Sequence, residues 1–145
     1  MLLFAAMIPL YPATVSFLVI ETGLPKESPA SQYATLWENC LMDVFFESGY
    51  IVSNAPILRL MEEPGNGLPS LAEAEFENAK NGGMDYFLVA VVKHPSPYEV
   101  SLRLFSTASK EMQQEHNFLE NSRIAGSEEK EVIKNSIRAF AKNME

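Results

Sequence analysis

The sequence is poor in cysteine and in basic residues, and each shortage excludes a class of protein. Its one cysteine, Cys40, cannot form an intramolecular disulfide or a zinc site built from paired cysteines. Lys and Arg number 11 against 19 Asp and Glu, so the net charge is -8. A chain of this charge repels nucleic-acid phosphates and anionic membrane surfaces. We therefore expect no nucleic-acid partner.

The sequence also lacks a long hydrophobic run. A membrane-spanning helix needs about 20 consecutive apolar residues, and Pro9, Pro12 and Thr14 interrupt the longest candidate. The apolar residues 1–13 have the character of the hydrophobic and cleavage regions of a secretory signal, but no Lys or Arg precedes Lys26. Two interpretations of residues 1–14 stay open: a signal-peptide remnant, or an apolar arm packed on the body. The residues before Cys40 do not form a lipobox, so lipid anchoring through Cys40 is not supported.

Recognisable catalytic and phosphate-binding motifs are absent as well. The sequence has no Gly-x-Ser-x-Gly elbow and no Gly-x-Gly-x-x-Gly or lysine-bearing phosphate loop. His94 and His116 fit no metal-ligand spacing, and they would form a site with Asp85 only if folding brought the three together. Cys40 falls on an apolar helical face, where a thiol behaves as a small hydrophobic group. We expect no enzyme activity, no catalytic residues, no metal and no cofactor.

What the sequence does contain predicts one folded domain. The chain has 145 residues, of which 47% are apolar, and a chain of this size buries roughly two-thirds of its surface on folding. We predict a single α/β domain over residues 15–145. Its expected order is β-α-β-α-β-β-(β)-α, with a mixed sheet of three to five strands and three helices.

The first half of the chain reads as strand, helix and strand. Val15–Ile20 is rich in β-branched residues and predicts a strand. Ser28-Pro29 offers a capped start for a helix that Gly49 ends. Residues 50–53 predict a second strand, and residues 57–61 predict one or two helical turns capped by Asn54. The apolar positions of the first helix recur at helical spacing: Tyr33, Leu36, Trp37, Cys40, Leu41, Val44 and Phe45.

The second half begins with an exposed loop at residues 56–69, which is dense in Gly and Pro. Ser70-Leu71-Ala72-Glu73 has the pattern of a capping box for a helix to Asn81, with Leu71, Ala72, Phe76 and Ala79 facing inward. Residues 86–92 predict a central strand buried on both faces. Residues 98–106 predict its hairpin partner, with one wet face and a place nearer an edge. Residues 112–119 predict an optional further strand, and the last helix begins at Ser127.

Two short motifs carry a resemblance to a known group. A long helix ends in Gly49-Tyr50-Ile51-Val52, and Ala79 precedes a strand entry that reads Gly83-Met84-Asp85-Tyr86-Phe87-Leu88-Val89. This pattern resembles the TolB amino-terminal-domain-like group, which includes outer-membrane activators of peptidoglycan synthases and CsgG-like secretion proteins. The resemblance implies a non-enzymatic protein that is periplasmic or associated with the outer membrane and that binds another protein. The other location left open is the cytoplasm.

The expected function is protein–protein interaction in the cell envelope, through a sheet edge or the 56–69 loop. Ile57, Leu60 and Leu68 are the predicted partner-binding residues, because they are apolar residues in an exposed segment. The alternative is a carrier of a small apolar ligand, with a pocket between the first helix and the sheet near Trp37, Phe45 and Phe87. The identity of the partner and the oligomeric state stay open.

Overall fold

A mixed sheet of six strands organises the structure, a computed structural model that describes residues 12–25, 29–62, 64–94, 98–119 and 127–144. Strand β1 (Thr14–Thr22) pairs in parallel with β2 (Ile51–Asn54), β3 (Leu58–Leu60) and β4 (Tyr86–Lys93). Strands β5 (Glu99–Ser106) and β6 (Met112–Leu119) continue the sheet in antiparallel sense. The strand order is β2-β1-β4-β5-β6, with β3 also beside β1. The predicted α/β class is confirmed.

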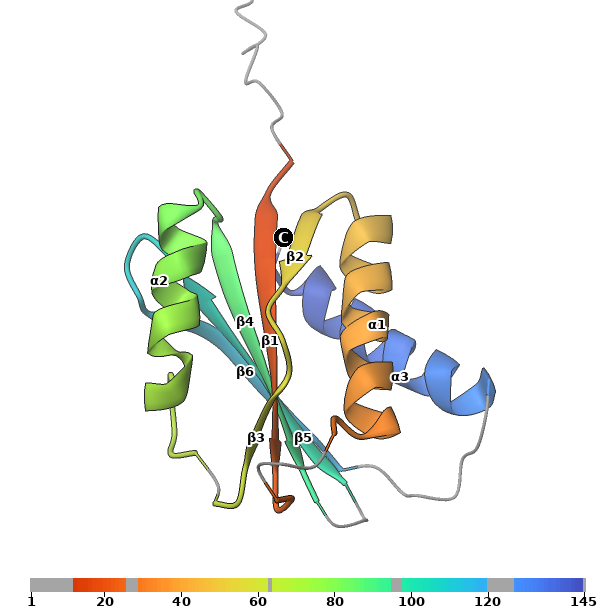
Figure 1. Ribbon diagram of the computed structural model, residues 1–145. Helices are drawn as coiled ribbons and strands as arrows, with labels where there is room; N and C mark the ends of the chain where they lie inside the picture. The colour runs from red at the N-terminus through yellow and green to blue at the C-terminus, as the bar shows by residue number, and fades with distance from the viewer. Residues whose placement is uncertain (1–11, 26–28, 63, 95–97, 120–126, 145) are drawn as a thin grey trace, which may run out of the picture.

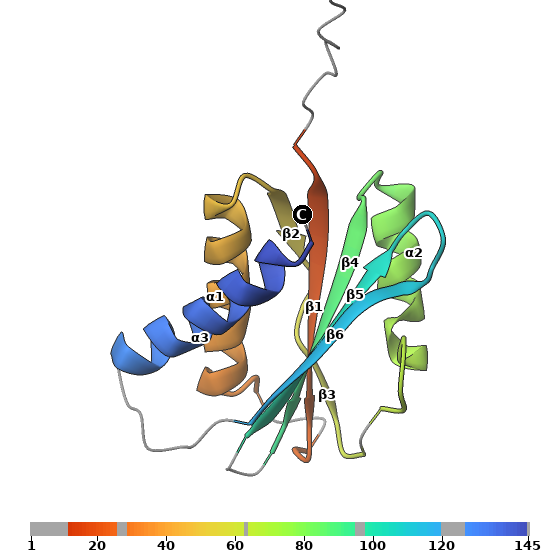
Figure 2. The same cartoon turned by 180° about the vertical axis from the view of Figure 1, so that it is seen from behind.

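Helices cover both faces of the sheet (Figures 1 and 2). Helices α1 (Gln32–Glu47) and α3 (Ser127–Lys142) lie on one face, and α2 (Glu73–Asn81), after the short 3-10 helix η1 (Ser70–Ala72), lies on the other. Because side chains alternate along a strand, β1 sends Phe17 into the core under α1 and Leu18 into the core under α2. Strand β4 is buried on both faces, as predicted.

Strand β3 corrects the expected helical turns at residues 57–61. Strand β1 has nine residues, but β2 pairs only with Thr14 to Phe17. The far end of β1 would leave buried backbone groups unpaired, and Leu58–Leu60 satisfies them by pairing with Ile20 to Thr22. Pro56 has no N–H to donate and separates β2 from β3. The sheet therefore has one strand more than the upper end of the predicted range.

Two helix starts also differ from expectation. Helix α1 is capped by Ser31, whose hydroxyl accepts from the Ala34 N–H at 3.0 Å, and not by Ser28, which lies outside the described residues. The predicted capping box at Ser70 does not form, because a 3-10 turn occupies those residues and no side chain caps η1 or α2. Glu73 instead pairs with Lys110 at 2.6 Å.

Strand β5 is not the half-exposed edge strand that its alternating sequence predicted. Its polar residues Ser101 and Arg103 are buried, at 2% and 5% exposure. Strand β6, the optional strand of the prediction, forms and takes the edge position. None of the helices in the described ranges has the length and apolarity that a membrane crossing requires.

Candidate functional site

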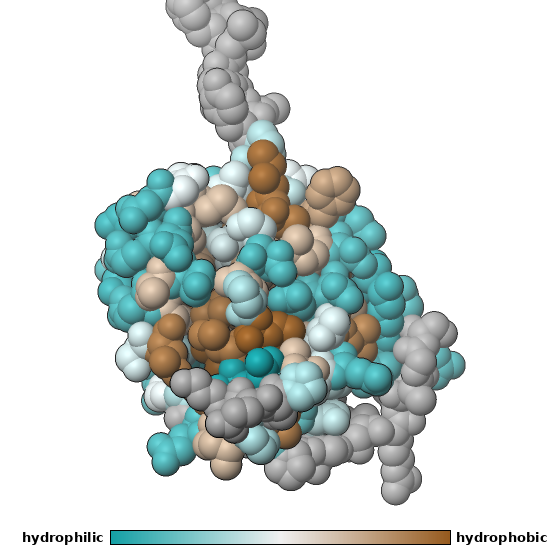
Figure 3. Space-filling view, viewed as in Figure 1, coloured by the Kyte–Doolittle hydropathy of each residue, from teal (hydrophilic) through white to brown (hydrophobic). Residues whose placement is uncertain are grey.

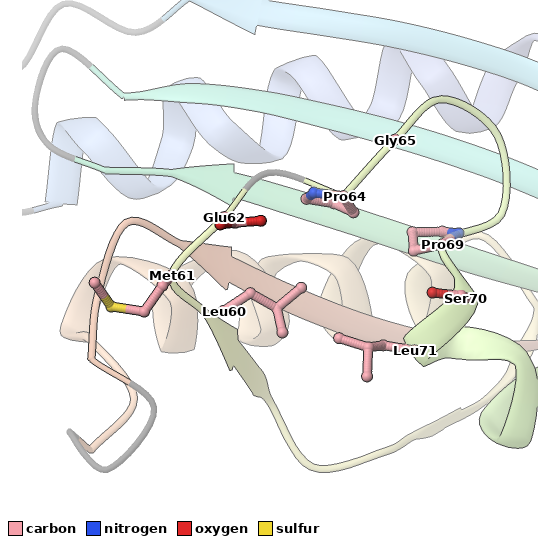
Figure 4. A pocket seen from close by; sticks show the side chains of 8 residues that line it. All are labelled: Leu60, Met61, Glu62, Pro64, Gly65, Pro69, Ser70 and Leu71. Carbon is pink, nitrogen blue, oxygen red and sulfur yellow. The ribbon is translucent and has the colours of Figure 1, made fainter.

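A hollow of about 450 Å³ opens where the chain passes from β3 to α2 (Figure 4). Leu60 comes from the end of β3 and Leu71 from η1, and their side chains extend toward one another in the close-up. Met61 and Leu71 are 65% and 50% exposed, which is unusual for large apolar side chains. Figure 3 shows apolar surface gathered in the lower half of this face of the molecule. The lining residues are Leu60, Met61, Glu62, Pro64, Gly65, Pro69, Ser70 and Leu71.

A buried arginine holds the wall of this hollow in place. Arg103 projects from β5 on the α2 side of the sheet and donates to the carbonyl oxygens of Gly65 and Gly67, both at 2.8 Å. Its Nε also lies 3.5 Å from a carboxylate oxygen of Glu115 on β6. Hydrogen bonds from a charged donor are the stronger ones. The loop at 64–69 is therefore tied to the sheet.

The three predicted partner-binding residues do not lie together. All three are partly buried: Ile57 packs against the core under α1, whereas Leu60 and Leu68 pack against the core under α2. Only Leu60 lines the hollow. Sequence reasoning missed Met61, which was grouped with the short helical turns, and Leu71, which was placed on the inward face of α2. The 3-10 turn at residues 70–72 breaks that helical periodicity and leaves Leu71 in solvent.

A second cluster, absent from the sequence analysis, lies at the end of β1. The Glu21 side chain is fully buried, and its carboxylate accepts from the Ser31 N–H at 3.0 Å and from the Ser31 hydroxyl. Nε2 of His94 lies 2.8 Å from Oε1 of Glu21. The Ser31 hydroxyl is engaged by Glu21 and not by His94, so this arrangement lacks the base–nucleophile contact of a hydrolase. It connects the start of α1 to the ends of β1 and β4.

Folding does not bring together Asp85, His94 and His116. Asp85 precedes β4 and binds Thr14, with 2.9 Å to its backbone N–H, whereas His94 follows β4. The eight-residue strand between them places them nine residue steps apart, which is roughly 30 Å. His116 is exposed on β6 against Phe118, and His94 has a nearly buried side chain. The described part of the chain contains no group of three or more His, Cys, Asp or Glu placed to hold a metal ion.

Cys40 lies on the buried face of α1, as predicted, and is fully inaccessible. Burial disfavours the thiolate and raises the pKa of this thiol from 9.0 to about 11, while Lys130 and Lys134 act weakly in the opposite direction. The group is a neutral thiol at physiological pH and is not an activated nucleophile.

Solved structures share this architecture. Lipoprotein GNA1162 from Neisseria meningitidis aligns with a TM-score of 0.53 at 14% identity, over 91% of this chain and 99% of the other. PelC from Paraburkholderia phytofirmans, a dodecamer, aligns with a TM-score of 0.52 at 16% identity, over 88% and 86%. The chain shares its fold with cell-envelope proteins. The predicted resemblance is thereby confirmed at the level of the fold.

TolB from Acinetobacter baumannii aligns at a TM-score of 0.49 and 13% identity, over 88% of this chain and 27% of TolB. No known family and no curated protein matches the sequence itself. At identities of 13–16%, the comparisons show a shared fold and do not identify a binding partner.

Proposed function

We propose that this protein is a non-enzymatic component of the cell envelope, periplasmic or associated with the outer membrane, that binds another envelope protein. The observation that carries the proposal is the exposed pair Met61 and Leu71 beside the hollow. Exposed apolar side chains that border a concavity are typical of protein-binding sites. The fold shared with cell-envelope proteins supports the location.

The composition of the hollow specifies the chemistry of the partner. The lining is apolar at Leu60, Met61 and Leu71, and Glu62 adds an acidic group at the same site. The protein also carries a net charge of -8. The fitting partner segment is therefore an apolar side chain flanked by Lys or Arg, which fills the hollow while its positive charge faces Glu62.

The pinned loop makes this surface ready for binding. Arg103 fixes the carbonyl groups of Gly65 and Gly67, and Gly65 belongs to the lining. A wall that is already ordered loses less conformational entropy when the partner docks. Of the three predicted residues, Leu60 lines the hollow and Leu68 packs against the core under α2 on the same side of the sheet, whereas Ile57 packs against the core under α1.

Site-specific photocrosslinking in cells tests the proposal. A photoreactive residue at Met61 or Leu71 should capture one discrete protein, whereas the same residue at Phe46, an even more exposed apolar position on α1, should not. The captured protein should then bind the purified chain with an affinity that falls as salt is added, because opposite charges attract. Equal capture from Phe46, or none from Met61 and Leu71, contradicts the proposal.

A ligand carrier is the second candidate, and one observation favours it. The core under α1 is filled with aromatic rings, including Trp37 against Phe118 at 5.8 Å between centroids. Yet Nε1 of the buried Trp37 has no hydrogen-bond partner among the described residues. A small ligand with a carbonyl or hydroxyl oxygen would satisfy this donor. Titration of Trp37 fluorescence with such ligands tests the idea, and a flat response throughout contradicts it.

A further inference from the structure

The sheet ends on one side in a long strand whose outer backbone edge pairs with no described strand. Strand β6 has eight residues, and Figure 2 shows it at the front of that view with no ribbon between it and the reader. Its end residues Met112 and Leu119 are 43% and 76% exposed. The strand contains no Pro and no Lys, the residues that commonly protect edges from pairing. Every second residue of such a strand directs its backbone N–H and C=O outward.

The opposite side of the sheet is closed to strand addition. Strand β2 has four residues and β3 has three, and Pro56 interrupts the path between them. Pairing β6 with this edge of another copy would give a short and broken ladder. Pairing β6 with β6 of another copy joins two eight-residue edges and gives a longer ladder. The strand lengths therefore favour a two-fold symmetric dimer over a head-to-tail chain of copies.

The pleat limits which registers are allowed. A two-fold axis perpendicular to the sheet makes the pair antiparallel and keeps each face continuous, so opposed residues must lie on the same face. The register that aligns all of β6 sets Glu115 opposite His116, and neighbouring residues lie on opposite faces. A shift by one residue either way restores the faces. One shift puts Glu115 opposite Glu115, and the other puts Glu115 opposite Asn117.

Like charges directly opposite are destabilising, whereas an amide can donate to a carboxylate. Glu115 is the only Asp, Glu, Lys or Arg in β6, and its charge is already opposed by Arg103 at 3.5 Å. We infer that β6 pairs antiparallel with β6 of a second copy of this chain, with residues 114–118, which follow the bulge at Gln113, aligned and Glu115 opposite Asn117 of the second copy. His116 then lies at the two-fold axis.

The face under α3 gives this pairing an additional apolar contact. A hollow of about 230 Å³ lies between β6 and α3, lined by Gln114, His116 and Phe118 of the strand and by Phe140 of the helix, among others. In the inferred register, Phe118 of the second copy stands opposite Gln114 at the rim of this hollow. An aromatic ring there would bury apolar surface of both copies.

The test is sedimentation equilibrium of the purified full chain with two variants at one exposed position. Asn117→Glu opposes Glu115 with a like charge and should weaken the dimer at least tenfold. Asn117→Lys opposes it with an opposite charge and should strengthen the dimer. Asn78→Glu, on α2 and away from β6, should change the dissociation constant less than twofold. Because each copy carries -8, added salt should favour the dimer.

A covalent readout tests the register. His116→Cys should form a disulfide between two copies under mild oxidation, whereas Ser109→Cys, in the turn before β6, should not; the buried Cys40 does not interfere. A monomer at all concentrations and salts would overturn the inference and leave the edge to a strand of another protein. A dimer whose dissociation constant is unchanged by both Asn117 variants would overturn the inference as well, and so would a larger ring.

Discussion

The substitution Arg103→Met should release the loop that forms one wall of the hollow. Methionine keeps the apolar stem but removes two hydrogen bonds of 2.8 Å, to Gly65 and Gly67. Each bond from a charged donor contributes about 1.5–3 kcal/mol. Loss of the guanidinium also removes the penalty for burying a charge, which is several kcal/mol. We expect a net loss of about 2 kcal/mol in the free energy of unfolding and a melting temperature lower by about 5–8 °C.

Hydrogen exchange locates the effect. The amides of residues 64–69 should exchange much faster in Arg103→Met, whereas those of β4 should change only by the global loss of stability. Arg138→Met is the matched control, because Arg138 is 42% exposed and its ion pairs lie on the surface. That variant should stay within about 0.5 kcal/mol of the parent. Unchanged protection of the loop in Arg103→Met would refute the role assigned to the buried guanidinium.

Three further perturbations test the fold around the site. Gly23→Ala should destabilise the protein by about 2–4 kcal/mol in chemical denaturation, because φ is +82° and a Cβ would meet the His94 carbonyl oxygen at 2.6 Å. The control Gly49→Ala has φ +93° but open space around the Cβ, so its free energy of unfolding should fall by only about 1 kcal/mol. Glu21→Gln should destabilise the protein by about 2–4 kcal/mol, since an amide replaces a buried carboxylate that is hydrogen-bonded to Ser31 and His94. An unchanged melting curve would contradict the role of that cluster. Cys40 should resist thiol reagents until the chain unfolds. Its folded pKa of about 11 exceeds the unfolded 9.0, so its contribution is fully present below pH 9 and is lost as the pH rises toward 11, by roughly 2–3 kcal/mol. Cys40→Ala should lack this loss, and equal pH profiles for both proteins would contradict it.

The sequence predicted the elements whose side chains repeat regularly. The apolar stripe of α1 and the continuous apolar run of β4 each report burial directly, because hydrophobic periodicity follows the geometry of helix and strand. Two elements escaped. Strand β3 has three residues and forms because β1 offers it a partner, so no local pattern predicts it. Arg103 alternates with apolar neighbours and looks solvent-facing, yet a distant loop supplies its acceptors.

The candidate site was half predictable for the same reason. The Gly- and Pro-rich segment was identified as an interaction surface, and Leu60 does line the hollow there. Ile57 packs against the core under α1, on the other face of the sheet from the hollow. The Glu21 and His94 pair joins the ends of two strands that are distant in sequence, and no sequence motif predicts the contact. Contacts of this kind depend on the topology of the sheet.

The most direct test of the central claim is the affinity between this protein and the partner captured at Met61. Leu71→Glu places a negative charge in the apolar hollow, and Phe46→Glu places the same charge at an exposed apolar position of α1. We predict that Leu71→Glu weakens binding at least tenfold with an unchanged melting temperature, whereas Phe46→Glu binds like the parent. Equal affinities for the parent and Leu71→Glu would contradict the claim that the hollow is the binding site.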